Sequence, residues 1–149
     1  MTPQARAEKC ADLMFAQDAA SPGLGMKIMA VSPGGATLEM RVRDDMLNGG
    51  EGCLGGYIFA LANSAFAFAC NSYNQLVVAQ QNQITYVNPA QKGELLRAAA
   101  TEVARSGRSG TYDVSVTGTD GRQIALFRGL SRQGKGTHFE EASTESPTP

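Results

Sequence analysis

The sequence of 149 residues has no tryptophan, a single histidine and three cysteines that lie far apart. His138 lies in a polar C-terminal stretch, so a Ser-His-Asp or Cys-His mechanism has no base and a histidine-ligated metal has no ligand. Cys10, Cys53 and Cys70 show no CxxC spacing, which predicts buried free thiols rather than disulfides or a zinc site. We therefore expect neither a metal nor a separate cofactor.

The sequence also lacks an excess of charge of either sign, because 13 basic and 14 acidic side chains leave a net charge of −1. This balance provides no basic field to hold nucleic acid. No run reaches the roughly 18 apolar residues of a membrane span, and the residues after Met1 are too polar for a signal peptide. We expect a cytoplasmic protein that binds neither nucleic acid nor membrane.

The most informative stretch is residues 46–72, MLNGGEGCLGGYIFALANSAFAFACNS. A glycine-rich turn leads at Gly55 and Gly56 into a helix that is apolar on nearly every side, with only Asn63 and Ser64 polar in its middle. Such a helix is buried. Its N-terminus presents unpaired N–H groups and the positive end of the dipole, which suits a developing oxyanion. The alternative is that the two glycines only allow close packing on a sheet.

One further helix and six strands are predicted around this stretch. Thr2-Pro3 predicts the start of an amphipathic covering helix over residues 3–18. Alternating patterns separated by turn-rich breaks predict strands, and the short breaks between them imply an antiparallel meander. The predicted strands cover residues 26–31, 36–43, 75–86, 95–105, 111–118 and 123–131.

The predicted fold class is α+β, with a curved antiparallel sheet of about six strands wrapped around one long central helix. Residues 1–132 form the single domain, and the polar residues 133–149 are expected to be a disordered tail. One small sheet cannot cover a helix that is apolar all round, so a second subunit is expected to supply part of the cover. We therefore predict a homo-oligomer.

Three segments resemble the acyl-CoA thioesterases of the phenylacetate-degradation branch of the hot-dog superfamily. They are residues 46–72, residues 84–116 and IALFRGLSR at residues 124–132. The resemblance implies a hot-dog fold, with dimers that share a continuous sheet and pair again into tetramers. It also implies hydrolysis of an aromatic or short-chain acyl-CoA, with coenzyme A as part of the substrate.

The resemblance also implies the site. The family motifs MLNGHxxCHGG and LAD read MLNGGEGCLGG and LAN here, so Gly50 and Leu54 replace histidines and Asn63 replaces the catalytic carboxylate. Asn63 lies about 10 Å along the helix from Gly56, so a working site takes its glycines from one subunit and Asn63 from the partner. The catalytic candidates are Asn63, Gly55, Gly56 and Asn48.

The remaining candidates are substrate contacts. Arginines near the strand ends are predicted to neutralise the phosphates of coenzyme A, although ordinary solvated charges would show the same spacing. Ser64 either lines the pocket or bonds back to the preceding turn. The substrate-binding candidates are Leu54, Ser64, Tyr57, Arg105, Arg108 and Arg128.

Asn63 leaves several explanations open. An amide can orient a water molecule but cannot deprotonate it at a useful rate. The chain is then a natural member with reduced or lost hydrolysis, a member whose base has moved, with Glu51 the nearest candidate, or an engineered inactive variant. A core amide without any catalytic role is a further alternative. A non-hydrolytic acyl-CoA-binding protein is the main competing function, and a dehydratase is disfavoured because the ordered region has no histidine.

Overall fold

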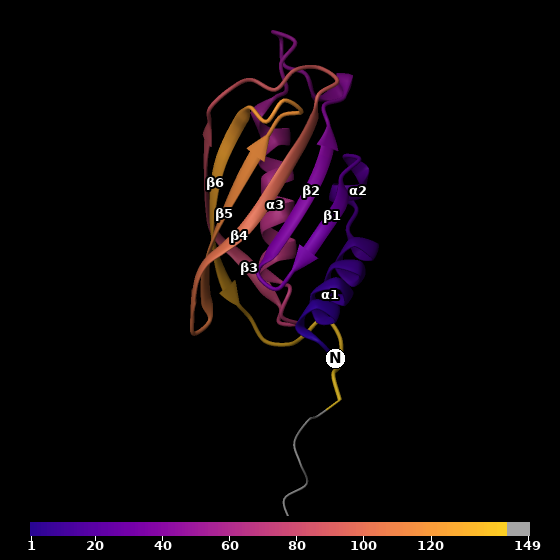
Figure 1. Ribbon diagram of the computed structural model, residues 1–149, viewed down its shortest axis with the longest axis vertical. Coiled ribbons are helices and arrows are strands. Elements are labelled where there is room, and N and C mark those ends of the chain that lie inside the picture. Colours follow the sequence, from indigo (N-terminus) through magenta and orange to yellow (C-terminus); the bar gives the residue numbers. More distant parts are fainter. Residues whose placement is uncertain (143–149) are drawn as a thin grey trace, which may run out of the picture.

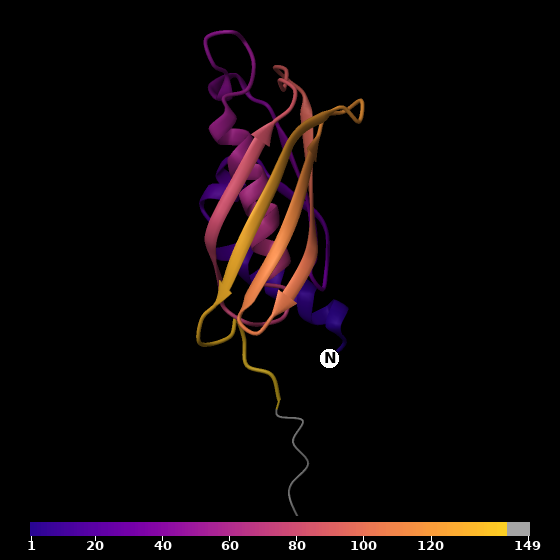
Figure 2. The same cartoon turned by 90° about the vertical axis from the view of Figure 1, so that its left-hand side faces the viewer.

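The computed structural model describes residues 1–142 and shows an antiparallel sheet curled around one long helix, α3 (Gly55–Cys70) (Figure 1). The sheet has six strands in the order β1-β2-β4-β5-β6-β3. Seen from the side, the strands form a curved layer in front of α3 (Figure 2). The predicted fold class is therefore confirmed. The strands are β1 (Lys27–Ser32), β2 (Gly35–Arg41), β3 (Val77–Tyr86), β4 (Leu95–Ser106), β5 (Ser109–Thr117) and β6 (Gln123–Gln133).

Helix α1 (Pro3–Gln17) forms as predicted, with the Thr2 hydroxyl accepting a hydrogen bond of 3.0 Å from the Ala5 N–H. Its Phe15 ring lies 6.2 Å from the Phe68 ring of α3, measured between centroids. A short helix, α2 (Ala20–Gly23), follows beyond the end of the predicted helix. The N-terminal helices thus cover a side of α3 that the sheet leaves open. Among the described residues, no helix is both long enough and apolar enough to cross a bilayer.

The core lies between α3 and the inner face of the sheet. Phe66 is 1% exposed, and its ring packs edge-on against Tyr112 of β5 at a centroid distance of 5.6 Å. Gly129 of β6 faces Phe66 so closely that a Cβ there would lie 2.7 Å from the ring. This close approach explains a glycine in the middle of a strand. Burying a phenylalanine in this way stabilises the fold by roughly 1.5–3 kcal/mol.

Strand β3 departs from the predicted meander. The meander is confirmed for β4, β5 and β6. Strand β3, however, pairs with β6 at the edge of the sheet. Residues 87–94 then cross from β3 to β4, which lies beside β2. Turn residues show where a strand ends, not which strand it pairs with. Within residues 1–142, no strand lies on the outer side of β3, and its Val78 is 63% exposed.

Residues 134–142, here called the C-terminal segment, pack against the domain. Asn74, with a φ of +59°, donates from Nδ2 to the Phe139 carbonyl and accepts the N–H groups of His138 and Phe139. Glu141 accepts a hydrogen bond of 2.7 Å from Arg6 of α1. The prediction of a disordered tail is wrong for this segment, because one asparagine can fix a polar backbone that has little apolar surface of its own. Residues 143–149 lie outside the described residues.

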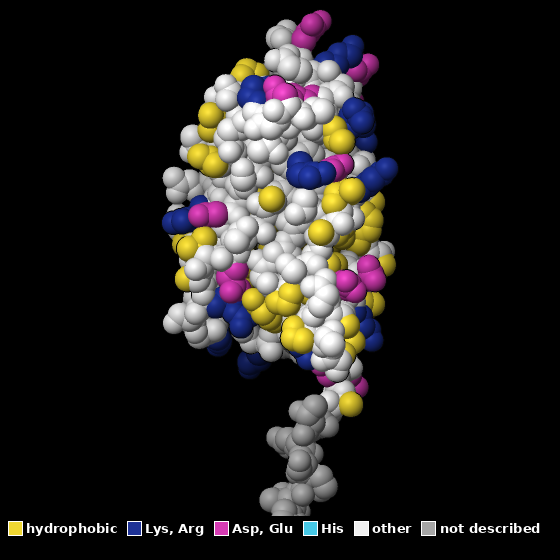
Figure 3. Space-filling model, viewed as in Figure 1, with side chains coloured by type: hydrophobic (Ala, Val, Ile, Leu, Met, Phe, Trp, Pro, Cys, Tyr) yellow, Lys and Arg dark blue, Asp and Glu magenta, His cyan; other side chains and the backbone are white. Residues whose placement is uncertain are grey.

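Basic and acidic side chains lie next to one another on the face shown in Figure 3. Opposite charges are also paired among the described residues, for example Arg97 with Glu39 at 2.6 Å and Arg122 with Glu94 at 2.9 Å, wherever on the surface they lie. Such pairing leaves no broad field of one sign on this face.

Candidate active site

Helix α3 begins without a side-chain cap. Within residues 1–142, no side chain accepts a hydrogen bond from the N–H groups of its first turn, and its N-cap residue, Leu54, is 51% exposed. The Leu54 backbone is fixed by its N–H, which donates to the Met46 carbonyl at 2.8 Å. Uncapped N–H groups and the positive end of the helix dipole therefore meet at Gly55 and Gly56.

Asn48 holds the turn that leads into α3. Its Oδ1 accepts hydrogen bonds from the N–H groups of Gly50 at 2.8 Å and Gly52 at 3.3 Å, and its own N–H donates to the Gly52 carbonyl at 2.8 Å. Glu51 sits at the exposed tip of this turn with a φ of +67°. The turn therefore gives Asn48 a structural task and directs Glu51 towards solvent.

The two glycines at the start of α3 have different surroundings. A Cβ at Gly55 would lie 2.9 Å from Cζ of Tyr86, and the Tyr86 hydroxyl donates to the Gly55 carbonyl at 3.0 Å. A Cβ at Gly56 would meet nothing within 4 Å. Close packing therefore accounts for Gly55, whereas Gly56 borders open space.

A cavity of about 480 Å³ adjoins this helix end. Tyr86 and Ile58 give it apolar walls, and Asn48 and Asn88 give it amide groups. Burial raises the pKa of the Cys53 thiol to about 11, so Cys53 contributes a neutral, apolar wall rather than a thiolate. Tyr57 packs against the core instead of lining this cavity.

Asn63 lies about two turns into α3 and faces the edge strand. Its Oδ1 accepts a hydrogen bond of 3.1 Å from Nδ2 of Asn82 on β3. The Asn82 Oδ1 is buried and finds no hydrogen-bond partner among the residues that the structure describes. The sequence pattern missed Asn82, although an asparagine facing the same way as Ile84 inside a strand is a signal that could have been read.

Ser64 points elsewhere. Its hydroxyl lies 2.8 Å from the hydroxyl of Ser21 in α2, and neither residue lines the cavity beside Gly55. Both predicted alternatives for Ser64, a pocket wall and a bond to the preceding turn, differ from this arrangement. Successive helical residues point in directions about 100° apart, which separates Ser64 from Asn63.

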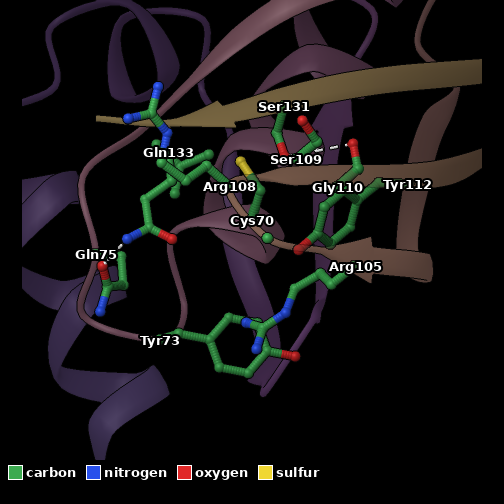
Figure 4. Close-up of a pocket in the computed structure, with 12 residues that line it drawn as sticks. Cys70, Tyr73, Gln75, Arg105, Arg108, Ser109, Gly110, Tyr112, Ser131 and Gln133 are labelled. Atoms are coloured by element: carbon green, nitrogen blue, oxygen red, sulfur yellow. Dashed lines mark hydrogen bonds between the residues drawn. The ribbon is translucent and has the colours of Figure 1, made fainter. Parts of the chain in front are cut away.

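A second cavity, of about 300 Å³, lies at the opposite end of α3 beside Cys70 (Figure 4). Arg105 and Arg108 both line it, and the Arg105 guanidinium lies 3.5 Å above the Tyr73 ring centroid. Arg105 is also 3.7 Å from Glu102, whose Oε1 accepts the hydroxyl protons of Tyr73 and Tyr112. The structure thus brings two of the three predicted arginines together.

Arg128 is the exception. It makes two hydrogen bonds with Asp113 on the outer face of the sheet, at 2.6 and 2.8 Å. The guanidinium holds the pKa of Asp113 below its usual range. The charge of Arg128 is therefore already matched by Asp113, and Arg128 lies apart from Arg105 and Arg108.

In one chain the candidate groups occupy three levels of α3. Asn63 is about 10 Å along the axis from Gly56, and Cys70 is about 20 Å from Gly56, at 1.5 Å per residue. A single chain therefore cannot bring Gly56 and Asn63 to one reacting carbonyl. Within residues 1–142, no three His, Cys, Asp or Glu side chains cluster as metal ligands would.

Comparisons with known proteins agree with this architecture. Residues 52–125 match the thioesterase superfamily. The chain is 37% identical over 132 residues to the acyl-coenzyme A thioesterase PaaI of Escherichia coli, which covers 89% of this chain and 94% of that protein. The structure of E. coli PaaI, from the phenylacetic acid degradation operon, superimposes with a TM-score of 0.90 at 35% identity, covering 91% and 99% of the two chains. The TT0310 protein of Thermus thermophilus superimposes with a TM-score of 0.74 at 37% identity, covering 77% and 97%.

Proposed function

The chain belongs to the thioesterase superfamily as a thioester hydrolase of the PaaI type, and we propose that it hydrolyses aromatic or short-chain acyl-CoA. Phenylacetyl-CoA and hydroxyphenylacetyl-CoA represent the aromatic class. The products are the free acid and coenzyme A, which is part of the substrate, so no other cofactor takes part. The observation that carries this proposal is the uncapped start of α3, which opens at Gly56 onto free space.

The first turn of α3 is the proposed oxyanion hole. When water adds to the thioester carbonyl carbon and loses a proton to solvent, negative charge develops on the carbonyl oxygen. The C–S bond then breaks, and the coenzyme A thiolate leaves and takes up a proton as the thiol. Fixed N–H donors at Gly55 and Gly56 stabilise that charge because they need no reorganisation during the reaction. Gly56 supports this role, since the space beside it admits a ligand.

The complete site requires a second copy of the chain. The free edge of β3 suits pairing with the same edge of another copy, which would set the two α3 helices antiparallel across a two-fold axis. Asn63 of the partner subunit can then face Gly56, which one chain alone does not allow. We expect a homodimer as the smallest active unit and a dimer of dimers as the full assembly, in the cytoplasm.

The same symmetry suggests where coenzyme A lies. If the partner's Asn63 faces Gly56, the partner's Cys70 lies about 10 Å further along the axis, seven residues on. The cavity lined by Arg105 and Arg108 of that partner then receives the pantetheine arm and the phosphates. Arg128 has no part in this arrangement, because Asp113 already binds it.

Asn63 limits the rate in this proposal. An amide orients water but does not accept its proton, so hydrolysis by this chain should be slow. The alternative function is a protein that binds acyl-CoA without hydrolysing it, and the missing carboxylate is the observation that favours it.

A steady-state assay of phenylacetyl-CoA and acetyl-CoA hydrolysis by the wild-type chain and by Asn63→Asp tests the proposal. A positioned carboxylate base contributes about 10²- to 10⁴-fold, so we expect kcat to rise by at least about 10²-fold. Gln17→Glu, which makes the same amide-to-carboxylate change at the exposed end of α1, is the control and should leave kcat unchanged. Equal rates for the wild type and Asn63→Asp would show that position 63 is not the chemical group. Acyl-CoA binding without turnover by either protein would favour the alternative.

A further inference from the structure

Asn82 faces Asn63 from the edge strand, and we infer that it is a positioning residue for the chemical group at position 63. This inference rests on the proposed function in one respect only, namely that position 63 carries that group. The hydrogen bond from Asn82 Nδ2 to Asn63 Oδ1, at 3.1 Å, is the contact through which Asn82 acts.

The direction of this bond decides what Asn63 can offer. A side-chain amide has one acceptor oxygen and one nitrogen with two donor protons. Because Asn82 occupies the oxygen, the groups that Asn63 retains for a ligand are chiefly its N–H donors. Such donors suit the oxygen of a carbonyl, of a water molecule or of a product carboxylate, and they do not suit proton abstraction.

A contribution to the stability of the fold does not explain why position 82 is an asparagine. Its Oδ1 is buried without a partner in the described part of the chain, and an unpaired buried acceptor costs about 1–3 kcal/mol. Ile84, two residues on, faces the same way with an apolar side chain that packs against the core. A residue that breaks the local packing rule and still contacts the group at 63 is expected at a functional site.

The contact also suits a carboxylate. The Asn82 N–H would donate to a carboxylate at position 63, favour its charged form and so lower its pKa. It would also fix the orientation of that group and leave the second oxygen for water. Strand β3 therefore supplies the surroundings of a catalytic carboxylate, although the chain carries Asn63.

The test compares Asn63→Asp with the double variant Asn63→Asp/Asn82→Leu. Leucine has the same number of side-chain heavy atoms, branched at the same position, and no donor, so the pKa of the carboxylate at position 63, measured by NMR titration, should rise by about one unit. The acid limb of the kcat/KM profile should move to higher pH by the same amount. We expect kcat to fall by about 10- to 100-fold with little change in KM, because the carboxylate loses its orientation.

Three controls make the outcome decisive. Asn82→Thr keeps a donor and should restore part of the pKa shift in the Asn63→Asp background. Gln83→Leu changes the neighbouring residue on the opposite face and should leave the pKa of the carboxylate at position 63 unchanged. Thermal unfolding should show that Asn82→Leu is as stable as its parent, since it removes an unpaired buried oxygen.

An unchanged pKa in the double variant would overturn the inference. If Asn63→Asp hydrolyses no acyl-CoA while the pKa still shifts, the proposed function fails and the positioning role of Asn82 stands.

Discussion

The two ends of helix α3 differ in whether side chains bond their terminal backbone groups. At the C-terminal end, Asn71 is 4% exposed, and its Nδ2 donates to the carbonyls of Ala67 at 2.9 Å and Val77 at 3.1 Å. Its Oδ1 accepts the Val77 N–H at 3.0 Å and lies 2.9 Å from Nε2 of His138. At the N-terminal end, no described side chain caps the helix, and a Cβ at Gly56 would meet nothing.

On the proposed function, this difference assigns stability to the C-terminal end of α3 and ligand binding to the N-terminal end. A capped and buried end is stable because its carbonyls are paired. An uncapped end beside open space keeps its N–H donors for a ligand, and the dipole makes that ligand an anion or a polarised carbonyl. The length of α3 keeps the two tasks apart, so changes at one end should leave the other largely intact.

The substitution Asn71→Ala is the strongest test of the contrast between the two ends of α3. The change removes four hydrogen bonds at a buried position and leaves their partners unpaired, so we expect the free energy of unfolding to fall by about 3 kcal/mol. Urea denaturation measures this loss. Asn48→Ala, which removes a comparable side chain from the exposed turn before α3, should cost only about 1 kcal/mol. Equal losses would contradict the contrast between the two ends.

The two glycines sharpen the comparison at the N-terminal end. Gly55→Ala places a methyl group against the Tyr86 ring, which is half exposed and can shift, so we expect a loss of about 1 kcal/mol in stability. Gly56→Ala meets open space and should stabilise the helix by about 0.5–1 kcal/mol. The same change should lower kcat/KM about 10-fold, because the methyl group occupies the space of the acyl group.

Thermal unfolding and acyl-CoA hydrolysis, both measured in the Asn63→Asp background, distinguish these effects. Opposite signs in stability, with a loss of activity for Gly56→Ala, would support the assignment of Gly55 to packing and Gly56 to the ligand. Unchanged kinetics in Gly56→Ala would mean that the open space serves no substrate.

Local patterns in the sequence predicted most of the fold. The Thr2 cap, the glycine entry to α3 and the alternation in β5 each depend on neighbours within a few residues, and the structure shows all three. The position of β3 and the docking of the C-terminal segment were missed. Both depend on partners far away in the chain, such as Asn74 with Phe139, 65 residues apart.

The candidate site divides in the same way. The motif around Asn48, Gly55 and Gly56 is local, and the structure places these residues together at one helix end. Side-chain partners were not predictable, because Asn82 lies 19 residues from Asn63 and meets it only when β3 passes α3. Periodicity also did not reveal that Asp113 neutralises Arg128.

The smallest predicted effect concerns pH and again the C-terminal end of α3. Both N–H groups of Asn71 donate to carbonyls, so its Oδ1 is an acceptor for His138, and we infer that Nε2 carries the proton. Burial lowers the pKa of His138 below its ordinary value of 6.5. The unfolded chain therefore takes up this proton at a higher pH than the folded chain does. The contribution to stability is complete above about pH 6.5 and is lost as the pH falls through the lowered pKa.

Urea denaturation between pH 7.5 and pH 5.5 should thus show a declining free energy of unfolding, and His138→Gln should remove part of that decline. The effect should be much smaller than that of Asn71→Ala, because His138 is only partly buried. Asp113 and Glu141 also have lowered pKa values, but carboxylates titrate below this window. Hydrolysis at pH 7.5 by the Asn63→Asp protein should be unaffected by His138→Gln, since His138 bonds Asn71 and Asn74 at the C-terminal end of α3, far from Gly56. A change in kcat there would show that the two ends of the helix are coupled.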